Sequence, residues 1–216
     1  NINQSLATII EVPADYPTIQ LAIDAAVDGD EIIVAPDTYN EAINFNGKKV
    51  DLHSSGGQLV TIIDGSGLNT SVVTVTSGEG PHSMLTGFTI TGGNALSGGG
   101  MNVENSSPLV TSCTFIENYA DWGGGGIYYQ DGAMMVQDCI FTRTSAKYFG
   151  GAVQDVRSNL LMLDSIFTEN IAGMHGGAIA YIQSGPLMAN CEFTNNSCDM
   201  NGGAIYGEES SLSVIE

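Results

Sequence analysis

The amino-acid sequence predicts an all-β fold: a right-handed parallel β-helix of three-strand coils, about 26 residues per coil, with an N-terminal capping helix. Three observations lead to this prediction. Gly-Gly pairs followed by a small and then an aliphatic residue recur every 26 residues. A phenylalanine column keeps the same interval. Between these markers lie short β-type runs such as "LVTSCTF" and "MMVQDCIF", where a helical repeat would need long stretches of helix formers.

The repeat occupies the second half of the chain. Its glycine pairs begin at Gly98, Gly124, Gly150, Gly176 and Gly202. Four further columns keep the interval: Phe115, Phe141, Phe167 and Phe193; Cys113, Cys139, Ser165 and Cys191; Asn118, Thr144, Asn170 and Asn196; Ala120, Ala146, Ala172 and Cys198. Five columns without one insertion indicate a solenoid, in which each coil buries its apolar face on the next.

Stacking turns each column into a ladder with a step of roughly 4.8 Å, the spacing of neighbouring strands. We expect the phenylalanines to point inward, the asparagines to hydrogen-bond along a corner, and the glycines to allow bends that a Cβ would prevent. Right-handed coiling follows from the general preference of parallel crossovers.

The first hundred residues fit the same architecture with looser spacing. Residues 1–29 are predicted to be an N-terminal segment and capping helix, because "DYPTIQLAIDAAVDGD" has Pro17 at its start and a narrow apolar stripe. Residues 30–97 are predicted to form irregular coils, and residues 98–216 regular coils, all in one domain. The sequence stops partway through a repeat unit, so we expect a fragment of a longer solenoid.

Composition restricts the classes of partner. Asp and Glu outnumber Lys and Arg by 24 to 5, giving a formal net charge of −19. Nucleic acids and anionic membranes bind basic surfaces, so neither is an expected partner. No apolar run approaches 18 residues, which argues against membrane insertion. The start "NINQSLATII" lacks the features of a signal peptide, and earlier removal of one is left open. An acidic, soluble repeat protein suits an extracellular or cell-surface location.

Two resemblances add to this interpretation. The segments "GGAV" at Gly150, "GGAI" at Gly176 and "FTEN" at Phe167 resemble the GGA(I/L/V) and FxxN repeats of the chlamydial polymorphic membrane proteins, which implies a β-helical surface adhesin. The match departs where Gly replaces Ala in the early units and where Thr144 replaces Asn. The segments "TIQLAIDAA" and "TYNEAI" are similar to the opening of the pectin-lyase-like superfamily, including pectin methylesterases. Their catalytic segments are not recognisable, so this resemblance implies a fold and a cap.

Two carboxylate arrangements could carry chemistry. Asp138 and Asp164 share a column, one coil apart, where they could bind Ca²⁺ or form a catalytic pair. An exposed polar ladder is the simpler interpretation, and calcium is the candidate cofactor if any binds. Asp155 and Arg157 are expected on one face of a strand, with Asp131 one coil below. A lyase could use these three groups, although balancing the surrounding negative charge is the simpler interpretation of Arg157.

Aromatic residues cluster near the glycine bends and could contact sugars or proteins. The column Trp122, Tyr148, Met174 and Met200 is expected to pack in a corner. Tyr128 and Tyr206 share the adjacent column and are the predicted ligand face. The four cysteines show no metal-binding pattern, and stacked Cys113 and Cys139 have parallel Cβ vectors, so we expect free thiols acting as small apolar fillers.

Taken together, the sequence predicts an extracellular structural or adhesive module. Its expected partner is a protein or polysaccharide of a host or neighbouring-cell surface, and end-to-end self-association through an uncapped coil is a further expectation. The alternative is a carbohydrate-active enzyme, a polysaccharide lyase or hydrolase, or a polysaccharide-binding β-helix.

Overall fold

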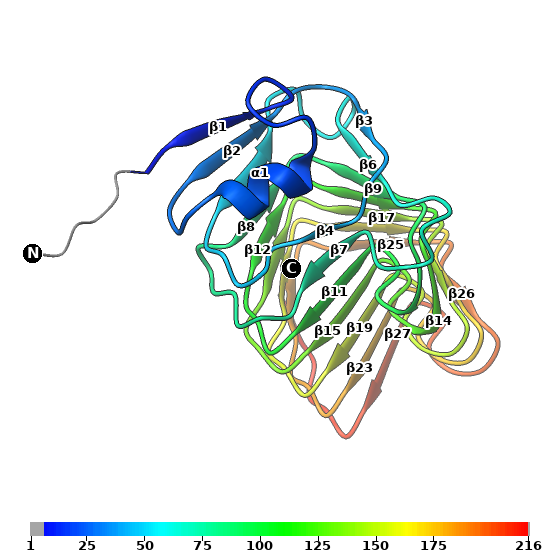
Figure 1. Ribbon diagram of the computed structural model, residues 1–216. Helices are drawn as coiled ribbons and strands as arrows, with labels where there is room; N and C mark the ends of the chain where they lie inside the picture. Colours follow the sequence, from blue (N-terminus) through cyan, green and yellow to red (C-terminus); the bar gives the residue numbers. More distant parts are fainter. Residues whose placement is uncertain (1–6, 216) are drawn as a thin grey trace, which may run out of the picture.

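The computed structural model describes residues 7–215 and shows a parallel β-solenoid with four sheets running along its length (Figure 1). We number the sheets 1 to 4 in the order in which the chain passes through them within each regular coil. Each strand pairs in parallel with its equivalents in the coils before and after it. This agrees with the predicted fold class.

The four sheets differ in length. Sheet 1 contains β1 (Ile9–Val12), β2 (Glu31–Val34), β5 (Asp51–Ser54), β8 (Met84–Thr86), β12 (Leu109–Thr111), β16 (Met135–Gln137), β20 (Leu161–Leu163), β24 (Leu187–Ala189) and β28 (Ser213–Ile215). Sheet 2 contains β3 (Thr38–Tyr39), β6 (Ile62–Asp64), β9 (Thr89–Thr91), β13 (Thr114–Ile116), β17 (Ile140–Thr142), β21 (Ile166–Thr168) and β25 (Glu192–Thr194). Sheet 3 contains β10 (Asn94–Ser97), β14 (Tyr119–Gly123), β18 (Ser145–Ala146), β22 (Ile171–Ala172) and β26 (Ser197–Cys198). Sheet 4 contains β4 (Ile43–Asn44), β7 (Val73–Val75), β11 (Met101–Glu104), β15 (Ile127–Gln130), β19 (Val153–Val156), β23 (Ile179–Ile182) and β27 (Ile205–Glu208).

The coils have four strands where three were expected, because each regular coil has four corners. In one coil, Ser112, Glu117, Gly124 and Asp131 all have positive φ, from 50° to 64°. A single left-handed residue turns the chain sharply between two extended segments. Glycine is required at Gly124, since a Cβ there would collide with the carbonyl oxygen of Ile127. The strands of sheet 3 fill the segment between the second and third corners.

The phenylalanine ladder is buried, as predicted. Phe115, Phe141 and Phe167 have no exposed surface, and Phe193 is half-buried in the last regular coil. Successive ring centroids lie 4.9, 4.8 and 4.8 Å apart with the planes within 8° of parallel. The strand pairing places Phe141 opposite both Phe115 and Phe167, so the 26-residue register of the backbone sets the stacking distance.

The predicted asparagine ladder is also present at the corner between sheets 2 and 3. The Asn170 amide nitrogen donates to the Phe141 carbonyl at 3.0 Å and to Asn196 Oδ1 at 2.9 Å. Asn170 Oδ1 accepts from the Thr144 hydroxyl at 2.8 Å. The threonine therefore continues the ladder as a donor. These buried bonds satisfy backbone groups that the turn would otherwise leave unpaired.

Helix α1 (Ile19–Ala25) covers the N-terminal end of the solenoid, as predicted (Figure 1). It buries Ile19, Ala22 and Ile23 against the first coil. Glu41 accepts hydrogen bonds from the first two backbone amides of the helix at 2.9 Å, and the Lys48 ammonium donates to three carbonyls at its C-terminal end. These charges oppose the helix dipole at both ends.

The N-terminal segment adds one element that was not expected, strand β1, which pairs with β2 and turns Ile10 and Val12 toward the core. The one helix of residues 7–215 has seven residues, and no helix in this range is long and apolar enough for a bilayer.

The four cysteines carry free thiols. Cys113 and Cys139 are buried, and each thiol points to the backbone carbonyl two residues earlier at 3.2 Å. Burial raises the pKa of Cys113 to about 12. We expect alkylation of the native protein to spare both thiols and to modify half-buried Cys191 and Cys198. Mass spectrometry after non-reducing unfolding should count four alkylated cysteines, and a Cys113–Cys139 bridge would contradict the packing.

Candidate functional site

The three groups proposed for a lyase do not share one face. Asp155 lies within β19 and is buried with no exposed surface, whereas Arg157 follows the strand and is half-exposed. The expectation that both side chains point the same way is therefore wrong. The reason is the backbone of Arg157: its φ of 49° places it at a corner, and the strand alternation that would bring residues i and i+2 to one face ends there.

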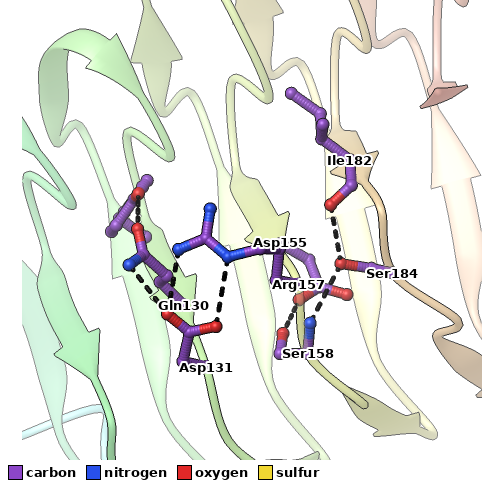
Figure 2. Close-up of polar contacts among 8 residues, drawn as sticks. Gln130, Asp131, Asp155, Arg157, Ser158, Ile182 and Ser184 are labelled. Atoms are coloured by element: carbon purple, nitrogen blue, oxygen red, sulfur yellow. Dashed lines mark hydrogen bonds and ion pairs between the residues drawn. The ribbon is translucent and has the colours of Figure 1, made fainter. Parts of the chain in front are cut away.

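Arg157 pairs with Asp131 one coil below, as Figure 2 shows. The guanidinium donates from Nη2 and Nε to the two carboxylate oxygens at 2.9 and 3.3 Å. Asp131 also accepts from Gln130 Nε2 at 2.9 Å, and Gln130 accepts from the Tyr128 hydroxyl at 2.6 Å. The contact with Arg157 lowers the pKa of Asp131. Arg157 is thus neutralised by its neighbour and is not free to act as a base.

Asp155 occupies the interior of the coil. One of its oxygens accepts a short hydrogen bond from the Ser158 hydroxyl, and Oδ2 has no hydrogen-bond partner among the described residues (Figure 2). Its register neighbours are Tyr129 below and Tyr181 above, both buried. Desolvation raises the pKa of Asp155 to about 6. Because Asp155 has no exposed surface, a substrate does not contact it in this fold, and its ionisation acts on stability.

Asp138 and Asp164 lie at the exposed corner between sheets 1 and 2, with φ near 50°. Asp164 accepts a hydrogen bond from Asn190 Nδ2 at 3.0 Å, which continues the polar ladder by one coil. Asp138 borders an open hollow of about 440 Å³ beneath the loop at residues 56–59. Among residues 7–215 there is no cluster of three or more His, Cys, Asp or Glu side chains that could hold a metal ion. The geometry is that of an exposed polar ladder.

Calcium binding at this corner stays a prediction, with an effect on stability only. A divalent ion between the carboxylates of Asp138 and Asp164 would relieve their repulsion and stabilise the fold by mass action. The melting temperature measured in calcium should be a few degrees higher than the melting temperature measured in chelator. Asp164→Asn should remove the difference, whereas Asp37→Asn, at an exposed position on the first coil, should retain it.

The predicted ligand face does not form a continuous surface. Tyr128 and Tyr206 are half-buried and lie three coils apart, while Gln154 and Ala180 between them are buried. Tyr128 is held by Gln130, and the Tyr206 ring stacks on His175 at 4.4 Å. This column therefore lies along sheet 4, in β15, β19, β23 and β27, with its two middle members buried.

The neighbouring column, which was expected to pack, is the exposed one. Trp122 is 49% exposed and Met200 61% exposed, and Leu96, in the coil before Trp122, is 74% exposed. Tyr148 and Met174 are half-buried between them. We call these five residues the Trp122 strip: Leu96, Trp122, Tyr148, Met174 and Met200. Leu96 and Trp122 lie in β10 and β14 of sheet 3, and the other three residues follow β18, β22 and β26 of the same sheet by two positions.

The fold and the positions of these side chains can now be compared with known proteins. A family model described as "right handed beta helix region" matches residues 37–216. The chain belongs to this right-handed β-helix family. The hand of the coil is therefore the predicted one. A search of curated proteins found no match.

Three solved structures share the β-helix with this chain. Pectin methylesterase from carrot has a TM-score of 0.60 at 13% identity, covering 99% of this chain and 84% of that one. A point variant of pectin methylesterase in complex with a hexasaccharide has a TM-score of 0.58 at 12% identity, covering 93% and 80%. Another pectin methylesterase, also in complex with a hexasaccharide, has a TM-score of 0.57 at 11% identity, covering 87% of this chain and 66% of that chain. At these identities the likeness is one of fold.

Alternation in the sequence predicts the opposite face for the exposed strip. In this β-helix, Trp122, Tyr148, Met174 and Met200 follow the small column of Ala120 by two residues. Strict alternation would turn both columns inward. Strands β18, β22 and β26 have only two residues each, so Tyr148, Met174 and Met200 lie beyond them. Trp122 lies within β14, where Asp121 and Trp122 are both exposed and the alternation breaks.

Proposed function

We propose that this β-helix is an extracellular adhesive module that binds a polysaccharide or protein of a neighbouring surface. The observation that carries the proposal is the Trp122 strip, a row of large apolar side chains at one-coil spacing, of which Leu96, Trp122 and Met200 are exposed and Tyr148 and Met174 are half-buried. Contiguous exposed apolar surface on a folded protein is typical of binding sites. The resemblance of the GGA(I/V) and FxxN repeats to those of the chlamydial polymorphic membrane proteins supports an adhesin in particular.

The candidate catalytic groups support a binding role over catalysis. Acid–base chemistry on a sugar needs unlike groups that converge on one accessible point. Asp155 faces the core, Arg157 is neutralised by Asp131, and Asp138 and Asp164 are part of a ladder of similar groups. A repeated surface of this kind suits repeated contact with an extended partner.

The test uses beads that carry the chain. They are expected to retain members of a panel of purified polysaccharides and extracellular-matrix glycoproteins, with no chemical change in what is retained. Beads carrying an unrelated acidic protein are the control. Failure to retain any member of the panel would count against the adhesive function.

The second candidate is a carbohydrate-active enzyme, favoured by the fold shared with pectin methylesterases. It predicts methanol release from methylated pectin, or unsaturated products from polyuronates in the presence of calcium. We expect neither product. Turnover that is lost in Arg157→Ala but retained in the equally exposed Arg143→Ala would establish the lyase in place of the adhesive module.

A further inference from the structure

We propose that the Trp122 strip binds an uncharged linear polysaccharide that lies parallel to the solenoid axis. This inference rests on the adhesive function proposed above and names its binding face and ligand class. The earlier candidates for a ligand face, Tyr128 and Tyr206, are not part of this strip.

The Trp122 ring is held in place yet leaves much of its surface free. It packs on Tyr148 with 5.2 Å between ring centroids and on Phe149 with 5.9 Å, at interplanar angles of 54° and 52°. Nearly half of the residue is still exposed to solvent. A ring that its neighbours have already oriented loses little conformational entropy when a ligand stacks on it, which favours affinity.

The strip combines apolar and hydrogen-bonding groups, as sugars require. A pyranose presents C–H groups that pack on aromatic rings and hydroxyls that need polar partners. Asp121 and Lys147 lie beside the strip, and Asp121 accepts from the Tyr119 hydroxyl at 3.0 Å. The carboxylate and the ammonium can bond to sugar hydroxyls next to the ring of Trp122.

The spacing of the strip favours a polymer. Equivalent positions in successive coils are roughly 4.8 Å apart, so the five residues extend along the axis for about 19 Å. A linear polysaccharide also repeats a small unit along its length, and it can contact several coils in the same way. A globular partner has no such repeat, so it would contact each coil differently.

Charge restricts the polysaccharide to an uncharged one. The chain has a formal net charge of −19, and Asp121 and Asp199 are the sequence neighbours of Trp122 and Met200 in the strip. Lys147 places its ammonium over the Tyr148 ring at 5.2 Å, where it offsets only part of this charge. Polyuronates and sulfated glycans would be repelled by the remaining acidic groups.

The protein contains a single tryptophan, so its intrinsic fluorescence reports on this site directly. We expect mixed-linkage β-glucan or glucomannan, two uncharged linear polymers, to shift the Trp122 emission to shorter wavelength and to protect it from acrylamide quenching. Polygalacturonate should cause neither change. Absence of any change with both uncharged polymers, or an equal change with polygalacturonate, would overturn the proposal.

Substitutions locate the face independently. Affinity electrophoresis in gels containing the same polymers should show at least about tenfold weaker binding for Trp122→Ala, as for a central aromatic contact. Tyr128→Ala, a matched aromatic change on sheet 4, should bind like the wild type. Because Trp122 is half-exposed, its substitution leaves the fold intact, which circular dichroism would verify.

Three other results would contradict the inference, and they separate it from the adhesive function. Retarded migration that persists in Trp122→Ala places the glycan on another face. A dimer in sedimentation velocity that Trp122→Ala abolishes makes a second copy the occupant. If the beads retain only matrix glycoproteins, the adhesive function is supported and the polysaccharide ligand is contradicted. If the beads retain nothing, both proposals are contradicted.

Discussion

Replacing Phe167 with alanine is expected to lower the free energy of unfolding by about 3–5 kcal/mol, the usual range for a buried phenylalanine. Phe167 has no exposed surface and stacks on Phe141 and Phe193, each at 4.8 Å between ring centroids. The substitution removes both contacts and leaves a cavity between two coils whose backbones are hydrogen-bonded in register. That register prevents the coils from collapsing into the gap. Equilibrium urea denaturation would measure the loss.

The adjacent residue provides a matched control. Ile166 is in the same strand but points outward and is 39% exposed. Ile166→Ala should cost less than about 1 kcal/mol, since exposed substitutions rarely cost more. Similar losses for Ile166→Ala and Phe167→Ala would show that the ladder is no more important than the surface, and would contradict the inward phase of the phenylalanines.

Neutralising Asp155 is expected to change how stability depends on pH. Its pKa in the folded protein is about 6, above the value of 3.8 of an unperturbed aspartate. The folded state therefore binds the proton more tightly than the unfolded state does, and stability falls as the pH rises from about 4 to about 6. Above that range the buried charge costs about 3 kcal/mol, from a shift of about two pKa units at 1.36 kcal/mol each.

In Asp155→Asn this part of the pH dependence should disappear. The asparagine carbonyl can still accept from Ser158, while no charge forms in the core. The free energy of unfolding of the variant, minus that of the wild type, should increase by about 3 kcal/mol from pH 3.5 to pH 7. Any effect of the amide itself is the same at every pH and does not alter this increase. Asp199→Asn, at an exposed position, controls for the change in net charge. A difference between variant and wild type that stays constant with pH would show that folding does not raise the pKa of Asp155.

Much of the fold follows from the spacing of residues along the chain. A constant interval of 26 residues without insertions places equivalent residues on top of one another in successive coils. The phenylalanine and asparagine ladders could therefore be predicted from the sequence. Thr144 in place of asparagine did not disturb the prediction, because a hydroxyl also hydrogen-bonds along the ladder. The capping helix was predictable because its apolar stripe needed a partner, and the end of a solenoid provides one.

The number of corners and the directions of the side chains near them were decided by the tertiary structure. Asp131, Asp138 and Arg157 adopt positive φ although none is glycine, a choice that the hydrogen-bonded coils above and below impose. Each such residue interrupts the alternation that assigns faces in a strand.

For this reason the sequence by itself determined the repeat, the register and the residues of the ladders, whereas the structure decided what faces outward. Asp155 follows Val153 into the core by the alternation of β19, Arg157 at the corner turns to Asp131, and the ring of Trp122 in β14 lies outside where packing had been expected. Local period predicts a side chain's face only while the backbone stays extended. At a corner the face depends on one dihedral angle, which the contacts between neighbouring coils select.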